Sequence, residues 1–159
     1  MQQFLGRVLV AGATGRTGVW IVRSLHRHGV ATRLFVRSTQ KASELFGDDL
    51  PAEIAEGSAE NPEDIRRAVT GIDAFICAIG STAVTPETPP PSAIDRDAVI
   101  LLGKLARNAG VRHFILISSI GVTKPDHPLN RYGRVLDMKL AGENAILPKI
   151  GRASCRERV

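Results

Sequence analysis

Apolar residues fall in five short runs that recur along the chain. These runs predict β-strands at residues 7–11, 31–36, 52–56, 74–78 and 113–117. The segments between them have apolar residues three and four positions apart and predict helices at residues 16–28, 41–46, 62–69, 93–109 and 135–147. Most strand runs are continuously apolar, which is typical of strands covered on both faces. The alternation predicts an α/β fold, a doubly wound parallel sheet with helices on both faces.

Right-handed crossovers between such strands give the sheet order 3-2-1-4-5. Ligands of these sheets bind beyond the carboxyl ends of the strands, where the first and fourth strands lie side by side. Five loops meet at that crevice, at residues 12–18, 37–41, 57–61, 78–92 and 118–134. Polar and glycine residues of these loops are therefore the candidate ligand-binding residues.

The first of these loops is rich in glycine and joins the first strand to the first helix. Its sequence, GATGRTG at residues 12–18, has a glycine at every third position. Such a turn lets a phosphate approach the backbone, and the helix N-terminus offers free N–H groups and a positive dipole end. The spacing G-x-x-G-x-x-G differs from the common G-x-G-x-x-G. The turn therefore matches the phosphate-binding mechanism of that motif and not its exact sequence. A turn that binds nothing is the alternative. The residues predicted to hold a dinucleotide diphosphate are Gly12, Thr14, Gly15, Arg16, Thr17 and Gly18.

The loop after the second strand is basic where an acid would indicate NAD(H). Such an acid accepts the ribose 2′-hydroxyl, whereas this chain has Arg37, Ser38 and Lys41. A guanidinium favours a 2′-phosphate through charge-assisted hydrogen bonds. The sequence therefore predicts NADP(H) as the preferred cofactor, with NAD(H) as the alternative. Solvated loop charges are the other interpretation of Arg37 and Lys41.

Composition narrows the class of protein. The chain of 159 residues is long enough for one domain with a substantial core. No apolar run approaches the roughly 20 residues of a membrane span, and no secretory signal follows Met1. Two cysteines make no disulfide framework. We expect a cytoplasmic protein with no metal site and no nucleic-acid or membrane partner.

The last ten residues differ from the rest of the chain. Residues 150–159, IGRASCRERV, show no apolar periodicity and are similar to the translation of a common DNA-sequencing adapter. We interpret them as a non-native read-through tail after an incomplete domain at residues 1–149; a genuine basic tail is the alternative. Without Lys149 and this tail the formal net charge falls from +5 to +2, so the basic balance does not indicate a nucleic-acid partner.

Several of these segments together resemble a known family. GATGRTG at 12–18, VRS at 36–38 and GVRHFILISSIGV at 110–122 are similar to atypical short-chain dehydrogenase/reductases. That group includes the NmrA-like NAD(P)H-binding proteins and relatives of the flavin/biliverdin-IXβ reductases. HPLN at 127–130 and KLAGE at 139–143 extend the resemblance, which covers residues 7–147.

The resemblance implies a Rossmann fold that holds NADP(H) at the glycine turn, with Arg37 on the 2′-phosphate. It also implies an acid near the adenine after Gly57, where this chain has Ser58. Family members continue into further strands and a substrate-covering segment, so we expect C-terminal strands to be missing here. The strand-end residues that complete the expected cofactor site are Ser58, Ala78, Ile79, Gly80 and Ser118.

The catalytic dyad of the better-known reductases of this superfamily is absent. That dyad is a tyrosine and a lysine four residues apart on one helix face. The only tyrosine here is Tyr132, and Lys139 lies seven residues on, about 10.5 Å along a helix. Gly133 is expected to keep Tyr132 outside the last helix. Ser119 and Lys139 remain as candidate catalytic residues, with a loop hydroxyl and a solvated lysine as the alternative interpretations.

Two functions fit these features. The first is an NADPH-dependent oxidoreductase of a small conjugated, quinone-like or flavin-like acceptor, for which the cofactor supplies the chemistry and solvent can protonate. The second is a non-catalytic NADP(H)-binding redox sensor or regulator of an unidentified partner. A third expectation is that the chain is inactive alone, with its fifth strand an exposed edge prone to aggregation.

Overall fold

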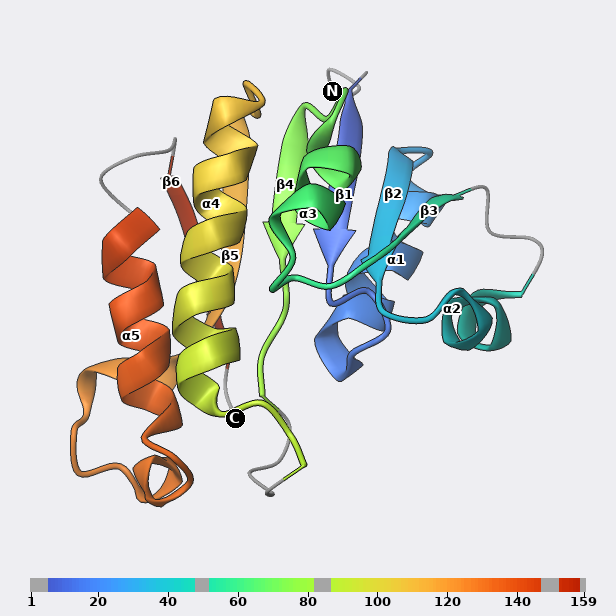
Figure 1. Ribbon diagram of the computed structural model, residues 1–159. Coiled ribbons are helices and arrows are strands. Elements are labelled where there is room, and N and C mark those ends of the chain that lie inside the picture. The colour runs from blue at the N-terminus through green and yellow to red at the C-terminus, as the bar shows by residue number, and fades with distance from the viewer. Residues whose placement is uncertain (1–5, 48–51, 82–86, 147–151, 158–159) are drawn as a thin grey trace.

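A computed structural model describes residues 6–47, 52–81, 87–146 and 152–157. One parallel sheet runs through the molecule in the order β3-β2-β1-β4-β5-β6 (Figure 1). Its strands are β1 (Arg7–Ala11), β2 (Ala31–Val36), β3 (Ala52–Glu56), β4 (Ala74–Cys77), β5 (His113–Ser119) and β6 (Arg152–Glu157). The first five strands have the predicted order 3-2-1-4-5, and the doubly wound fold is confirmed.

Helices cover both faces of this sheet (Figure 1). One face carries α1 (Arg16–Arg27) and α2 (Thr39–Phe46), whereas α3 (Pro62–Val69), α4 (Val99–Asn108) and α5 (Val135–Ile146) lie on the other. Shorter helical segments are the π-helix η1 (Ser92–Ala98) and the 3-10 helices η2 (Ile120–Thr123) and η3 (Pro128–Arg131). None of the helices in the described ranges is long and apolar enough to cross a membrane.

The core has two layers because successive strand residues face opposite sides of the sheet. In β1, Leu9 packs with Phe75 and Leu102 toward α3 and α4. Its neighbour Val10 packs with Val22 toward α1. All five side chains are fully buried. Continuous burial on both faces is the physical reason why this strand is apolar at every central position.

A buried arginine interrupts the apolar pattern of β2. Arg33 is 7% exposed and donates from Nη1 to the carbonyl oxygens of Ala68 and Thr70, at 2.6 and 2.7 Å. Its Nη2 pairs with Glu53 on β3 at 2.9 Å. The carbonyls belong to the last residues of α3, where no intrahelical N–H remains to satisfy them. Arg33 thus joins the sheet to the end of α3.

The main differences from the predicted elements lie at three places, and the other boundaries agree to within one residue. The predicted helix at 93–109 begins as the π-helix η1, and β5 extends two residues further, through Ser118 and Ser119. Helix α2 begins at Thr39 because the Ser38 hydroxyl accepts the Lys41 N–H at 3.2 Å and caps it. Sequence periodicity cannot distinguish a π-turn from an α-turn over so few residues.

One strand lies where the sequence analysis expected none. Residues 152–157 form β6, which pairs in parallel with β5 from Phe114 to Ser119. The outer side of β5 presents backbone N–H and C=O groups that can pair with an extended chain whatever its side-chain pattern. The expectation of an exposed edge at β5 is therefore wrong. The non-native origin of residues 150–159 stays a prediction.

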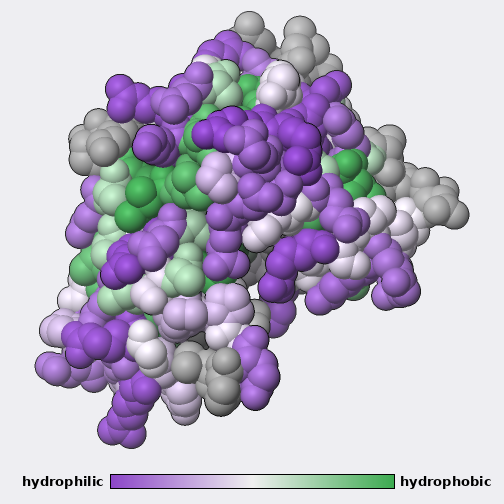
Figure 2. Space-filling model, viewed as in Figure 1, coloured by the Kyte–Doolittle hydropathy of each residue, from purple (hydrophilic) through white to green (hydrophobic). Residues whose placement is uncertain are grey.

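A shallow groove lies on the outer surface of the helical layer, between α4 and α5. Its volume is about 320 Å³, and Ile100, Gly103, Ala145 and Ile146 form its apolar part. Hydrophobic side chains are visible on this side of the molecule in Figure 2. The groove extends to the carboxyl ends of both helices, away from the carboxyl ends of the strands, so it is separate from the crevice considered below.

Candidate functional site

The turn between β1 and α1 approaches the end of β4 more closely than a side chain would allow. Gly12 has a φ of +78°, and a Cβ there would lie 2.5 Å from the carbonyl oxygen of Ala78. A Cβ at Gly18 would overlap the carbonyl group of Gly12, with the carbonyl carbon 2.8 Å away. Gly12 therefore permits the tight turn, and Gly18 permits α1 to begin directly against it.

The other side of this turn is open. Gly15 is exposed, and a Cβ there would meet a single neighbour, the carbonyl oxygen of Gly12 at 3.2 Å. Gly15 is also the N-cap residue of α1, so no side chain caps this helix, and its first turn has no acid. Arg16 is exposed, and Thr14 and Thr17 are half-buried. The N-terminal end of the α1 dipole is thus left without a capping side chain or an acid, which is the arrangement expected where an anion binds.

Two cations flank the loop between β2 and α2. Arg37 and Lys41 are exposed, and neither side chain makes a hydrogen bond or an ion pair within the described ranges. The carboxylate of Glu56, at the end of β3, accepts the Thr39 N–H at 2.9 Å and also the Thr39 hydroxyl. These hydrogen bonds lower the pKa of Glu56. The loop thus holds two unpaired cations beside one engaged carboxylate.

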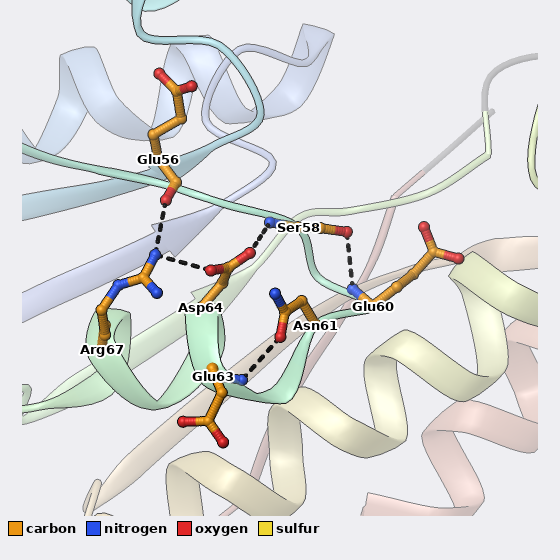
Figure 3. A network of polar contacts seen from close by, with 7 residues as sticks. All are labelled: Glu56, Ser58, Glu60, Asn61, Glu63, Asp64 and Arg67. Carbon is orange, nitrogen blue, oxygen red and sulfur yellow. Dashed lines mark hydrogen bonds and ion pairs between the residues drawn. The ribbon is translucent and has the colours of Figure 1, made fainter.

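The loop after β3 is held by a carboxylate from α3 (Figure 3). Asp64 accepts the backbone N–H of Ser58 at 3.0 Å and pairs with Arg67 at 2.8 Å, and the Ser58 bond is the main reason for its lowered pKa. The Ser58 hydroxyl accepts the N–H of Glu60 at 3.2 Å. The acid that the family places after Gly57 is thus absent from that position. A carboxylate reaches the loop from Asp64 instead, and it is engaged with the backbone.

Buried charges gather at the carboxyl end of β4. Ala78 and Ile79 are half-buried and Gly80 is exposed. The Lys139 ammonium on α5 lies 2.8 Å from Oδ1 of Asp95 on η1, and the Asp95 side chain has no exposed surface. Burial also raises the pKa of the neighbouring thiol of Cys77 to about 12. Such a thiol is an inert core residue at neutral pH.

The two serines at the end of β5 have different surroundings. Ser118 is 3% exposed, and its hydroxyl donates to the buried carboxylate of Glu143 on α5 at 3.3 Å. Ser119 is 5% exposed and lies on the opposite face, since neighbouring strand residues alternate. Its hydroxyl does not cap η2. The Ser118 side chain is therefore directed to α5. No contact with α5 is described for the Ser119 hydroxyl.

Tyr132 lies in the turn that follows η3, three residues before α5 begins. It is 63% exposed, and Gly133 and Arg134 after it both have positive φ angles. The prediction that Tyr132 lies outside the last helix is confirmed. The geometry needed for a Tyr-Lys dyad is therefore not present.

Sequence reasoning missed two buried carboxylates, Asp95 and Glu143. The signal was available in the helical periodicity. Asp95 is in step with the buried Ala98, Val99 and Leu102, and Glu143 lies seven residues after the buried Leu136. A charged residue on the buried stripe of a helix needs a partner inside the protein. Across the described ranges, no cluster of His, Cys, Asp and Glu is arranged to hold a metal ion.

The outer face of α1 carries the single tryptophan of the chain. Trp20 is 67% exposed, and the Arg23 guanidinium lies 5.6 Å from its ring centroid, a cation–π arrangement. Trp20 lies one helical turn after Arg16, which begins the helix at the glycine turn. An aromatic side chain thus stands exposed near the candidate diphosphate site.

Comparison with known proteins identifies the family. A family model described as NAD(P)H-binding matches residues 12–147, and the chain belongs to this NAD(P)H-binding family. A solved structure, a putative NAD-dependent epimerase/dehydratase from Bacillus halodurans, has a TM-score of 0.81 and is 27% identical. The match covers 96% of this chain and 70% of that one. The resemblance to the atypical short-chain dehydrogenase/reductases is thereby confirmed.

Among curated proteins, the chloroplastic Protein TIC 62 from Pisum sativum is 35% identical, over 88% of this chain and 30% of its own length. The ceramide reductase of Caulobacter vibrioides is 33% identical, and the match covers 89% of this chain and 42% of that protein. The NAD(P)H azoreductase of Xenophilus azovorans is 31% identical, and the match covers 86% of this chain and 41% of that protein. This chain therefore spans about a third to two fifths of these relatives.

Proposed function

We propose that this chain is the cofactor-binding part of an NADPH-dependent oxidoreductase. The observation that carries the proposal is the open glycine cradle at the uncapped N-terminus of α1, with the unpaired Arg37 and Lys41 at the adjacent loop. The backbone of residues 12–18 would hold the diphosphate. Arg37 would hold the 2′-phosphate through charge-assisted hydrogen bonds, and this contact is the basis of the proposed preference for NADP(H).

The nicotinamide half would lie at the other end of the crevice, along Ala78, Ile79 and Gly80. When bound, the reduced nicotinamide supplies a hydride to the acceptor. Ser119 and Lys139 are the side chains proposed to orient the acceptor or the nicotinamide ribose there. The reductase names of two relatives support this class of reaction. The proposed acceptor is a small conjugated molecule such as a quinone or a flavin.

Calorimetric titration with NADPH and NADH tests the cofactor preference. In Arg37→Asp the preference for NADPH is expected to fall about tenfold or more, because a charge-assisted pair is replaced by repulsion. Lys104→Asp makes the same change of charge at an exposed position on α4 and is expected to leave the ratio unchanged. An unchanged ratio in Arg37→Asp would exclude Arg37 as the 2′-phosphate ligand.

A non-catalytic redox sensor is the second candidate function. The observation that favours it is the exposed Tyr132 outside α5, which leaves the chain without the usual proton donor. Consumption of NADPH with benzoquinone distinguishes the two candidates. Steady turnover supports the oxidoreductase, whereas tight NADPH binding without turnover supports the sensor. A cytoplasmic location is likewise only a proposal, because the TIC 62 relative is named chloroplastic.

A further inference from the structure

Asp95 is the most completely buried charge at the crevice, and it makes one ion pair and two hydrogen bonds. Its Oδ1 receives the Lys139 ammonium at 2.8 Å. Its Oδ2 accepts the backbone N–H of Ser81 at 3.2 Å and the Ser81 hydroxyl at 2.5 Å. Both oxygens of this carboxylate are therefore engaged inside the protein, and Asp95 holds the Lys139 ammonium and Ser81 in fixed positions.

The fold brings these groups together through one close contact between helices. A Cβ at Gly142 on α5 would lie 2.6 Å from the backbone oxygen of Asp95, so the two elements meet with no side chain between them. Asp95 itself lies in the π-helix η1, a rare conformation that is frequent at functional sites. Lys139 is one turn before Gly142 on α5. These features direct the ammonium to the end of β4.

Lys139 reaches the exposed backbone of Gly80. A Cβ at Gly80 would lie 3.0 Å from the lysine Nζ and 3.3 Å from Oδ1 of Asp95. The Lys139 side chain is 18% exposed, so it is not sealed inside the protein. An ammonium has three N–H donors, and its place beside the exposed Gly80 puts them within reach of a ligand there.

The Lys139 ammonium and the Asp95 carboxylate together carry no net charge. Asp95 balances the charge of Lys139 at 2.8 Å, so an anion approaching Gly80 meets an ion pair rather than a free cation. An uncharged oxygen still gains a charge-assisted hydrogen bond from the ammonium. The pair therefore favours neutral acceptors over anionic ones.

We propose that Asp95 is a positioning residue that fixes Lys139 beside Gly80 and cancels its charge, so that the site receives an uncharged oxygen. That oxygen comes from a neutral carbonyl or quinone acceptor or from a sugar hydroxyl of the cofactor. This inference rests on the proposed oxidoreductase function for its substrate. The positioning of Lys139 by Asp95 does not depend on that function.

The first experiment measures turnover with NADPH, using benzoquinone as the neutral acceptor and a carboxylate-substituted benzoquinone as the anionic one. The intact protein is expected to prefer the neutral acceptor. Asp95→Asn leaves the ammonium without its counter-charge, so kcat/KM for the anionic acceptor relative to the neutral one is expected to rise about tenfold. Calorimetry with NADPH separates the two oxygen sources, because a weakened affinity in this variant indicates the sugar hydroxyl.

Two variants make the result specific to this carboxylate. Asp97→Asn removes an exposed carboxylate two residues away that pairs with Arg96, and it is expected to leave the acceptor ratio unchanged. Asp95→Glu keeps the charge and is expected to restore the neutral preference. A residue that only stabilised the fold would lower both activities together and would not improve the anionic one.

The second experiment needs no turnover. The ammonium protons of Lys139 are expected to give an NMR signal protected from exchange with water in the intact protein and in Asp97→Asn, but not in Asp95→Asn. Loss of this signal with the carboxylate supports the positioning even if no acceptor is reduced, in which case the oxidoreductase proposal alone fails. An unprotected signal in the intact protein, or an unchanged acceptor ratio in an active Asp95→Asn, overturns the inference.

Discussion

The two halves of the crevice are built in opposite ways. The half at β1 and β2 consists of bare backbone and exposed cations, with Gly15 and Arg37 both open to solvent. The half at β4 and β5 consists of buried polar pairs, Asp95 with Lys139 and Ser118 with Glu143. If the first half binds the diphosphate as proposed, no side-chain pair there has to be broken. The second half has its charges already matched within the protein.

This difference has a physical reason. A diphosphate is recognised by N–H groups and a helix dipole, which any sequence can supply once glycines allow a close approach. A reacting group needs a side chain in one orientation, and buried partners fix that orientation. Function of the first half therefore depends on open space at the backbone, and function of the second half depends on buried side-chain pairs. Substitutions should affect the two halves differently.

The largest expected effect is on the packing of the glycine turn. Gly18→Ala places a methyl group against the backbone carbonyl of Gly12, where no flexible side chain can move away. We expect the free energy of unfolding to fall by about 3 kcal/mol or more. Urea denaturation measures it. Gly47→Ala is the control, because nothing lies within 4 Å of a Cβ there and its positive φ alone costs about 1–2 kcal/mol. Equal losses in both variants would contradict the tight packing.

The next effect concerns pairing in the second half. Ser118→Ala removes the hydroxyl that donates to the buried Glu143, and the loss of a hydrogen bond to a charged group costs about 1.5–3 kcal/mol. Urea denaturation should show this loss while NADPH affinity changes little, because the hydroxyl is directed to α5. Ser43→Ala, at an exposed position on α2, serves as the control. A weakened NADPH affinity with full stability would show instead that Ser118 faces the cofactor.

A third substitution tests the open space of the first half. Gly15→Ala is expected to keep the fold, since its Cβ would meet only the Gly12 oxygen at 3.2 Å. The methyl group would occupy the side from which the diphosphate approaches, and NADPH affinity should fall about tenfold, or 1.4 kcal/mol. Calorimetry measures the affinity and urea denaturation the stability. Retained affinity in a folded variant would place the diphosphate elsewhere.

The smallest expected effect is the pH dependence of two carboxylates in the first half. Hydrogen bonds to Thr39 lower the pKa of Glu56, and a hydrogen bond from Ser58 lowers that of Asp64. Because the unfolded chain then binds protons more readily, these groups stabilise the fold above the ordinary carboxyl pKa of about 4. The contribution is lost as the pH falls through the folded pKa. Urea midpoints from neutral to acidic pH should decline less in Asp64→Asn, and an identical decline would contradict this origin.

The comparison also explains what the sequence could predict. The five-strand order and the glycine turn depend on neighbouring residues, such as the apolar run of β1 and the three glycines at 12–18, so periodicity and spacing were sufficient. The pairs of the second half join distant residues, and Ser118 and Glu143 are 25 positions apart in the sequence. Local spacing indicated Lys139 as a candidate, but only the packing of α5 on η1 reveals Asp95 as its partner. Strand β6 escaped prediction because backbone pairing with β5, not side-chain pattern, defines it.

The position of Trp20 gives the protein a built-in optical reporter. The chain has one tryptophan, exposed on α1 a single turn beyond the glycine cradle, so its emission has one source. Reduced nicotinamide absorbs light where indole emits, and excitation of Trp20 should therefore sensitise the fluorescence of a bound reduced dinucleotide. Occupancy of the cradle could then be followed in real time on the unlabelled chain.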